Sequence, residues 1–331
     1  SPVVGQTASA YQAWYVTDTD GNLSYREKLT IDDTADGRLA ITIGHLSDIV
    51  LLDAAGPTPG IVAQIVGGSS FTTLKDAIET AQDGQTVQLL QSVPLPSQIV
   101  VSGKSITLDL NNYTISRSAE NTNAWLLGVK PDGGLIIKDS GTAGKIDGTL
   151  SGGTGYGVLT NGSLTVQSGT ITGGYGIFAS GGSASATIQN GTILGSSIAI
   201  LVSPNAMLEV TGGTVAVTDA ENSTGEAIKA QFESTVKLSG GTIQGGQSGN
   251  AQLSEYSGVS LYNLRKLADG RGVLDNGAGA ISSKLEMAGG SINTKLYAVT
   301  GNNLQSACSM ATISGGTIKT TEGAAIYWPM E

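Results

Sequence analysis

Three aspartates, Asp109, Asp139 and Asp147, are the residues whose type and spacing best fit catalytic chemistry. Two facing carboxylates can act as general acid and base on a glycosidic bond, and a cluster of carboxylates can hold Ca²⁺. Either chemistry requires the side chains to converge on one face of the fold. The outward positions of the surrounding sequence supply Thr, Gln, Ser and Gly, with no repeated set of carboxylates. We therefore expect no catalytic site and keep these three aspartates as the alternative.

Two pairs of residues are candidates for ligand binding. Tyr156 and Tyr175 occupy like positions in successive sequence repeats, and aligned aromatic rings can stack on sugars. Stacking of aromatic rings on one another inside a repeat fold is equally expected. Tyr262 and Arg265 form the second pair, because they lie in a segment that interrupts the repeats, where binding residues of such folds are often found.

For the other residues that could take part in catalysis or metal binding, the sequence favours structural roles. His45 is the sole histidine and has no cysteine or histidine partner, so we expect a packed strand-end residue. The segment 18–22 begins like a calcium loop but lacks the distant Glu that closes one, which predicts a turn. Cys308 is the sole cysteine and cannot form an intramolecular disulfide. We expect no metal and no cofactor, and Ca²⁺ has no further support in the sequence.

A repeated phrase of eight residues predicts the elements that position these side chains. It reads LTVQSGTI at 164–171, an alternating apolar segment followed by a turn with Gly and then Thr-Ile. Further copies begin at residues 186, 208, 236, 285 and 311. The hydroxyl residues after the turns are 22, 22, 28, 49 and 26 residues apart, and we interpret the 49 as about two repeats.

This period, built from β-branched residues and Gly, predicts an all-β fold, a right-handed parallel β-helix with coils of about 22 to 28 residues. We expect two or three strands in each coil. The Thr and Ser positions should form an outward ladder of hydroxyl groups, while the Ile or Val after each of them fills the interior.

The chain divides into three parts by pattern. Residues 1–53 contain short alternating segments separated by Asp-Gly turns, which predicts a small antiparallel β module resembling the tail of a sandwich. Residues 54–70 predict a linker, and 71–331 the β-helix. A helix over 73–83 shows helical spacing of apolar residues, a capping box of Thr73 with Asp76, and Gly84 for its C-terminal cap. We expect it to cover the open end of the strand stack.

Two segments break the repeat. The larger, 248–277, is expected to be an insertion in which the part around 256–267 forms a helix or a lobe outside the stack. The smaller is 301–310. A tolerated surface loop is the simpler interpretation of each, although insertions in solenoids gather on one face that often binds partners.

Composition limits the partners. The net charge is −10 and the 17 Lys and Arg residues are scattered, which argues against a nucleic-acid partner. No run approaches the roughly 20 apolar residues of a membrane span. The N-terminus lacks the pattern of a signal peptide, so we expect targeting segments, if present, elsewhere in a larger parent chain.

The runs FTTLKDAIETAQDGQTVQLL from Phe71 and SITLDLNNYTI from Ser105, followed by SGGTI phrases, resemble the β-helix repeat regions of large surface proteins from Gram-positive gut bacteria. This resemblance covers about 71–331, and the end of the sequence, 325–329, resembles a segment that leads into another coil. It implies an extracellular protein, secreted or attached to the cell wall. It implies no catalytic residue.

The sequence therefore favours a non-enzymatic surface protein, either a stalk or an adhesin-like surface that binds glycans, host proteins or neighbouring cells. The alternative is a carbohydrate-active enzyme, a polysaccharide lyase or glycoside hydrolase of the β-helix type. The phrase Lys145-Ile146-Asp147-Gly148 is weakly similar to one found in pectin-type hydrolases, but the further paired aspartates and the histidine of that pattern are missing.

Overall fold

The computed structural model describes the β-helix over most of its length and the N-terminal module in part. The described residues are 9, 11–19, 22–34, 39–42, 48–53, 60–151, 155–218, 225–246, 257–262, 264–266, 272–274, 283–301, 303–304 and 307–328.

The N-terminal module is antiparallel, as predicted. Its main sheet has the order β2-β1-β5, in which β1 pairs with β2 through a tight hairpin and with β5 on its other edge. A second, two-stranded sheet joins β3 and β4. The strands are β1 (Tyr11–Thr19), β2 (Asn22–Leu29), β3 (Ile31–Asp33), β4 (Leu39–Ile41) and β5 (Asp48–Asp53).

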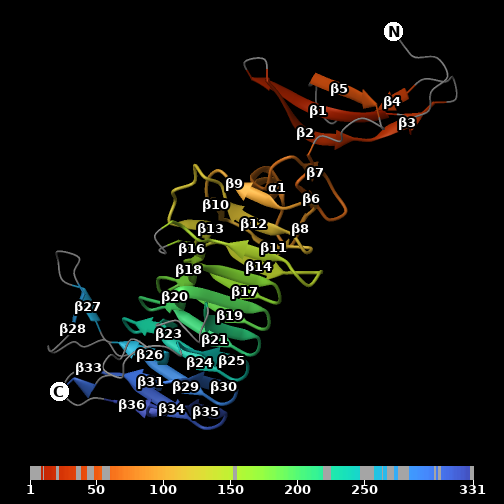
Figure 1. The fold of residues 1–331 in the computed structure, drawn as a ribbon. Helices are drawn as coiled ribbons and strands as arrows, with labels where there is room; N and C mark the ends of the chain where they lie inside the picture. The colour runs from red at the N-terminus through yellow and green to blue at the C-terminus, as the bar shows by residue number, and fades with distance from the viewer. Residues whose placement is uncertain are drawn as a thin grey trace.

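The rest of the chain is a parallel β-helix, which confirms the predicted fold class (Figure 1). Each coil contributes three strands, and each strand pairs in parallel with the equivalent strand of the next coil, so that three stacks of strands surround one hydrophobic interior. Stack A, within the 11-stranded sheet, contains β8 (Thr86–Leu89), β11 (Ser105–Asp109), β14 (Gly134–Lys138), β17 (Ser163–Val166), β19 (Ser185–Ile188), β21 (Met207–Val210), β24 (Thr235–Leu238), β29 (Lys284–Met287) and β34 (Met310–Ile313).

Stacks B and C share the 16-stranded sheet, because two long strands turn a corner of the coil without a break. These strands are β18 (Thr170–Ala179) and β20 (Thr192–Val202). Stack B is formed by β9 (Val93–Leu95), β12 (Thr114–Arg117), β15 (Lys145–Asp147), the first parts of β18 and β20, β22 (Thr214–Val217), β25 (Thr242–Gln244), β30 (Ser291–Thr294) and β35 (Thr317–Thr320). Stack C is formed by β10 (Ile99–Val101), β13 (Trp125–Val129), β16 (Tyr156–Thr160), the second parts of β18 and β20, β23 (Glu226–Gln231), β26 (Ser257–Tyr262), β31 (Tyr297–Gly301) and β36 (Ile326–Tyr327).

The register confirms the predicted ladders. In stack B, Thr170 pairs with Thr192 and Thr192 with Thr214, and the ladder continues through the hydroxyl residues of the later coils. The neighbouring Ile193 is fully buried, as are its equivalents in the coils on either side. Side chains of successive strand residues point to opposite faces, so the Thr-Ile dipeptide places a hydroxyl outside and a branched apolar side chain inside.

Glycine is required at the corner between stacks A and B. Gly213 has φ +75°, and a Cβ added there would lie 2.5 Å from the carbonyl oxygen of Gly191 in the preceding coil. The same carbonyl accepts the hydrogen bond from Thr214 N at 2.8 Å. Gly213, the second Gly of the phrase TGGTV, therefore serves both a left-handed backbone conformation and a close approach between coils, and Gly241 and Gly316 of the SGGTI phrases do the same.

The N-terminal end of the β-helix is covered by α1 (Leu74–Thr80) together with β6 (Ala63–Ile65) and β7 (Ser70–Phe71). Thr73 is the N-cap, and its hydroxyl accepts a hydrogen bond from Asp76 N at 3.0 Å, as the capping box predicts. The C-cap is Ala81 rather than Gly84, because the backbone at Ala81 already has a non-helical ψ of 135°. Lys104 Nζ donates hydrogen bonds to the carbonyls of Glu79 and Ala81 at this end.

β6 lies inside the range expected to be a linker, but it pairs antiparallel with β8 and closes the edge of stack A. The β6–β7 hairpin therefore belongs to the cap of the β-helix.

The interval of 49 residues spans one coil, so its interpretation as two repeats is wrong. Thr242 of β25 pairs directly with Ser291 of β30. Part of the expected insertion is β26, a strand of stack C paired with β23 and β31, so the helix expected around 256–267 is wrong. Residues 264–266 of that range lie in a separate two-stranded sheet outside the stacks, as the expected lobe would. Two small hairpins lie in the interruptions: β27 (Leu264–Lys266) with β28 (Gly272–Leu274), and β32 (Asn303–Leu304) with β33 (Ala307–Cys308).

Candidate functional site

Asp109 lies at the end of β11 and is almost fully buried. One carboxylate oxygen accepts hydrogen bonds from Asn111 N at 3.1 Å and Ser140 N at 2.9 Å, and the other accepts from Gln88 Nε2 at 3.2 Å. Burial raises the pKa of Asp109, but hydrogen bonds from Ser140 and Gln88 and the charge of Lys138 outweigh it, so the pKa is lowered. The group stays ionised and holds two turns together.

Asp139 follows β14 and fills the same corner one coil later. Its Oδ1 accepts hydrogen bonds from Asn112 N at 2.8 Å and Gly141 N at 3.1 Å, and its Oδ2 accepts from Gly144 N at 2.7 Å. The donors belong to two successive coils. Asp139 therefore satisfies backbone N–H groups that the corner would otherwise leave without partners.

Asp147 lies on β15 in stack B, on a different face of the coil. Its carboxylate accepts hydrogen bonds from Lys145 Nζ at 2.8 Å, Thr149 Oγ1 at 2.6 Å and Thr172 Oγ1 at 3.1 Å. Burial opposes ionisation of Asp147, but the hydrogen bonds from Lys145 and Thr149 outweigh it and lower the pKa to about 2. A carboxyl group with this pKa is a poor general acid or base near neutral pH.

The structure brings Asp109 and Asp139 together in one hydrogen-bonded corner and leaves Asp147 apart from them. Each carboxylate is occupied by donors of its own turn or of the adjacent coil. Within the described ranges, no group of three or more His, Cys, Asp or Glu residues is arranged to hold a metal ion. In the same part of the chain, no helix has the length and apolar character needed to cross a membrane.

Tyr156 and Tyr175 meet on the outer face of stack C. They pair in register on β16 and β18, and their ring centroids are 4.9 Å apart with an interplanar angle of 31°. Phe178 stacks on Tyr156 as well, at 5.5 Å and 27°. Burial, and secondarily the neighbouring Tyr175, raise the pKa of Tyr156. The rings use much of their faces on one another, so their edges and hydroxyl groups are the parts left for a ligand.

Trp125 extends this aromatic row by one coil, because it pairs in register with Tyr156. Its indole lies over Gly128, where an added Cβ would be 3.2 Å from Nε1. Trp125 Nε1 is buried and has no hydrogen-bond partner in the structure. The position of Trp125 at the start of its strand, like that of Tyr156, was the sequence signal that would have placed it with the tyrosines.

The remaining sequence candidates are placed by their backbone or lie outside the described residues. Tyr262 ends β26 and Arg265 lies on β27, and the structure does not describe their side chains. His45 lies outside the described residues.

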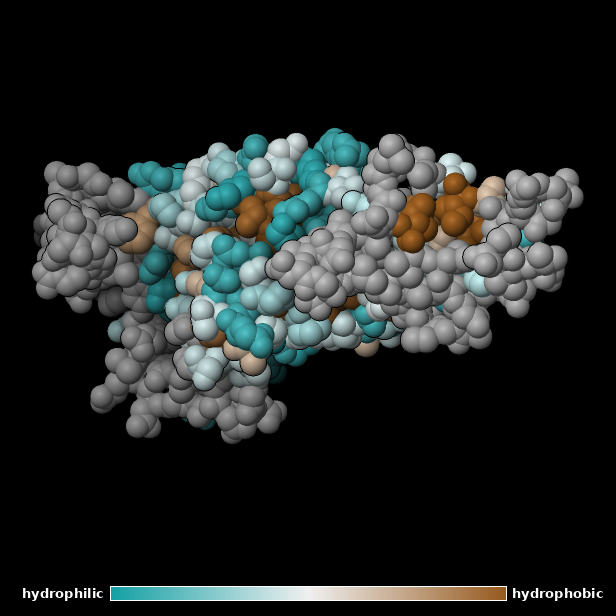
Figure 2. Space-filling view, turned by 90° about the horizontal axis from the view of Figure 1, so that it is seen from above, coloured by the Kyte–Doolittle hydropathy of each residue, from teal (hydrophilic) through white to brown (hydrophobic). Residues whose placement is uncertain are grey.

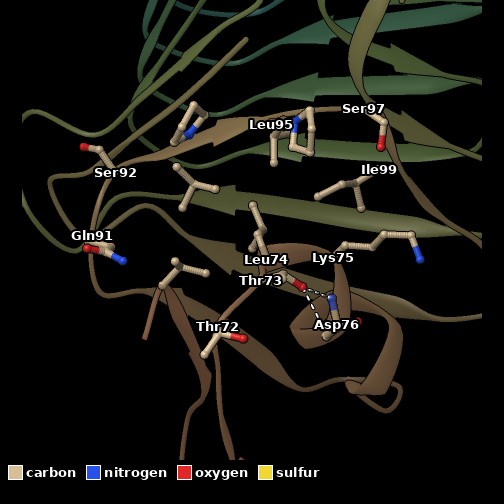
Figure 3. A pocket seen from close by; sticks show the side chains of 14 residues that line it. Thr72, Thr73, Leu74, Lys75, Asp76, Gln91, Ser92, Leu95, Ser97 and Ile99 are labelled. Atoms are coloured by element: carbon tan, nitrogen blue, oxygen red, sulfur yellow. Dashed lines mark hydrogen bonds between the residues drawn. The ribbon is translucent and has the colours of Figure 1, made fainter. Parts of the chain in front are cut away.

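A pocket that the sequence did not indicate lies at the N-terminal end, between α1 and β9 (Figure 3). Its volume is about 490 Å³, and we call it the cap pocket. Leu74, Leu95 and Ile99 line its apolar part, and Gln91 and Ser97 stand on opposite sides of it. Seen from above, the described surface is mostly hydrophilic, with a few separate hydrophobic patches (Figure 2).

A second hollow, a shallow groove of about 350 Å³, crosses the outer face of stack A. Glu209, Lys237 and Glu286 follow one another in register across it, and Lys237 Nζ lies 3.7 Å from a carboxylate oxygen of Glu286. Opposite charges that alternate along an exposed ladder mainly prevent repulsion between coils.

No family model matches this chain, and no curated protein or solved structure matches it either.

Proposed function

We propose that this chain is a rigid, non-enzymatic β-helical stalk within an extracellular surface protein. The supporting observation is the continuous pairing of three parallel stacks from the first coil to the last (Figure 1). From β8 to β34 the chain makes eight inter-strand steps of about 4.8 Å, or about 38 Å of rod. In every coil but the last, the interior is filled with buried side chains, mainly Ile, Leu and Val, and such close packing resists bending. The surface location itself rests on the resemblance of the repeats.

The hydrogen bonding of the aspartates supports a structural role over catalysis. General acid–base chemistry on a glycan needs carboxyl groups that reach the substrate. The carboxylates of Asp109 and Asp139 accept hydrogen bonds from backbone N–H groups of their corner. The carboxylate of Asp147 accepts hydrogen bonds from Lys145 and Thr149. The test is incubation of the full chain with a panel of acidic and neutral polysaccharides. The stalk predicts no new reducing ends and no unsaturated products, and cleavage that is lost in Asp139→Asn or Asp147→Asn would contradict it.

Mechanical resistance tests the stalk directly. The full chain, pulled from its two ends in single-molecule force spectroscopy, should unfold in a few large steps, because each coil is hydrogen bonded to both neighbours on three faces. Gly213→Ala, which disturbs one corner, should lower the force of one of these steps. Extension at low force without steps would contradict the proposal.

A second candidate is glycan binding at the aromatic row of stack C, and the observation that favours it is the alignment of Trp125, Tyr156 and Tyr175. A glycan array probed with the wild-type chain tests it. Binding should disappear in the double variant Tyr156→Ala/Tyr175→Ala and persist in Tyr297→Ala, whose ring stacks on Tyr327 elsewhere in the stack. Absence of binding, or binding that survives the double variant, would refute glycan binding at the aromatic row, and the stalk would remain as the proposed function.

A further inference from the structure

The cap pocket exists because the cap of the β-helix is incomplete. The β6–β7 hairpin closes the edge of stack A at β8, and α1 lies against β10 of stack C. Helix α1 has seven residues, about 10 Å of helix, which is too short to reach across the whole end of the coil. The first strand of stack B, β9, is left beside an opening whose floor is the apolar interior, formed by Leu74, Leu95 and Ile99.

The open edge of β9 is unsuited to a peptide strand. Leu95 O accepts a hydrogen bond from Ser118 N, so the backbone of Leu95 points toward β12. Backbone groups of successive strand residues point to opposite edges, so those of Pro94, the middle residue of β9, point toward the open side. Proline has no N–H to donate, and prolines on an edge prevent the pairing of a further strand. The pocket therefore favours a small molecule over an added strand.

The two charged side chains that line the pocket, Lys75 and Asp76, already have partners of their own. The Lys75 ammonium is paired with Glu79, one turn along α1. The Asp76 carboxylate accepts a hydrogen bond from the Thr73 hydroxyl at 2.7 Å as part of the cap. The remaining polar groups at the rim are the neutral side chains of Gln91, Ser92 and Ser97. A net charge on a ligand would find no free partner there among the described residues, which disfavours ions.

We propose that the cap pocket binds an uncharged amphiphilic small molecule. Its apolar body would lie against Leu74, Leu95 and Ile99, and its hydroxyl or amide head would meet the rim at Gln91 and Ser97 (Figure 3). The volume of about 490 Å³ lies within the range of small-molecule sites, which are largely apolar with a few polar groups. The proposal is independent of the stalk, so each can fail while the other stands.

Two dyes with the same ring system test this proposal on the full chain. N-Phenyl-1-naphthylamine is uncharged, and 1-anilinonaphthalene-8-sulfonate carries one negative charge. A fluorescence titration should show saturable binding of the uncharged dye at one site, at least about tenfold tighter than that of the sulfonate. Equal or tighter binding of the sulfonate, or a signal that rises without saturation, would overturn the proposal.

Blocking variants locate the site. Ser97→Phe and Gln91→Trp place bulky rings at the mouth from opposite sides, and both positions are exposed, so we expect the fold to tolerate them. Each should weaken binding of the uncharged dye by at least about tenfold. The control Ser163→Phe adds the same ring at an exposed position on β17 in stack A and should leave binding unchanged. Unchanged binding in both blocking variants, with wild-type circular dichroism, would place the dye elsewhere and refute the proposal.

Discussion

Gly213→Ala should destabilise the β-helix far more than its conformation alone explains. The backbone at Gly213 has φ +75°, and an L side chain in this left-handed region costs about 1 kcal/mol. The added Cβ would also lie 2.5 Å from Gly191 O and 2.9 Å from Asn190 C in the preceding coil. Both neighbours are backbone atoms that cannot rotate away. Overpacking of this kind adds about 1 to 3 kcal/mol, so we expect a total cost of about 2 to 4 kcal/mol.

Gly84→Ala is the matched control. Gly84 has φ +77°, almost the same as Gly213, but an added Cβ would meet nothing within 4 Å. This variant should therefore show the conformational cost alone, about 1 kcal/mol. Urea unfolding followed by circular dichroism, with the midpoints of both variants compared with the wild type, gives the difference. Equal destabilisation by the two substitutions would refute the claim that the corner glycines are required by contact between coils.

Three further predictions concern the corner carboxylate, the pH dependence and the alternation of the strands. Asp139→Ala removes the acceptor of three backbone N–H groups and should cost about 3 kcal/mol in urea unfolding, whereas Asp132→Ala, at an exposed turn position, should change stability by less than about 0.5 kcal/mol; similar costs would show that the hydrogen bonds are unimportant. Because the folded pKa of Asp147, about 2, lies below its ordinary value of 3.8, its contribution is complete above about pH 4 and is lost as the pH falls toward 2. Asp147→Asn should therefore flatten the acid limb of the stability curve by about 1 to 2 kcal/mol, and an unchanged limb would assign the effect to other groups. Ile193→Ala should cost about 3 kcal/mol because the side chain is fully buried, and Thr192→Ala, one residue earlier on the outer face, less than about 1 kcal/mol. Thermal melts of the pair check this alternation, and a reversed order would contradict the assigned faces.

The strand stacks could be predicted from the sequence because the alternation of apolar and polar residues that defines them is local. In the phrase around Ile193, the apolar residue, the turn glycine and the Thr follow one another within a few positions, and the structure places each on the predicted side. Coil number was not predictable from spacing. Thr242 and Ser291 are far apart in the sequence, but they pair directly in adjacent coils. The extra residues inserted in this coil lengthen the sequence interval without adding a strand to stack B.

The candidate site was predicted by residue type but not by partner. An aspartate near a β-helix face can point to a substrate or to the N–H groups of its own turn, and the choice at Asp109 and Asp139 depends on residues about one coil away, such as Asn112 and Ser140. The cap pocket was unpredictable for a related reason. It arises where a short helix and the segment with Pro94 and Pro96 line one opening at the end of the coil, an arrangement that no local pattern describes.

The distance between two labelled coils measures most directly whether the stack is rigid and how many coils it contains. Ser105 and Lys284 lie in one register row of stack A, linked through β14, β17, β19, β21 and β24. Spin labels on Ser105→Cys/Lys284→Cys, in a Cys308→Ser background, can be measured by double electron–electron resonance. A rigid stack in which β25 and β30 belong to adjacent coils predicts a narrow distribution near the span of six steps of about 4.8 Å, or about 29 Å. A broad distribution would contradict the rigid stalk, and a narrow peak about 5 Å longer would contradict the assigned coil number.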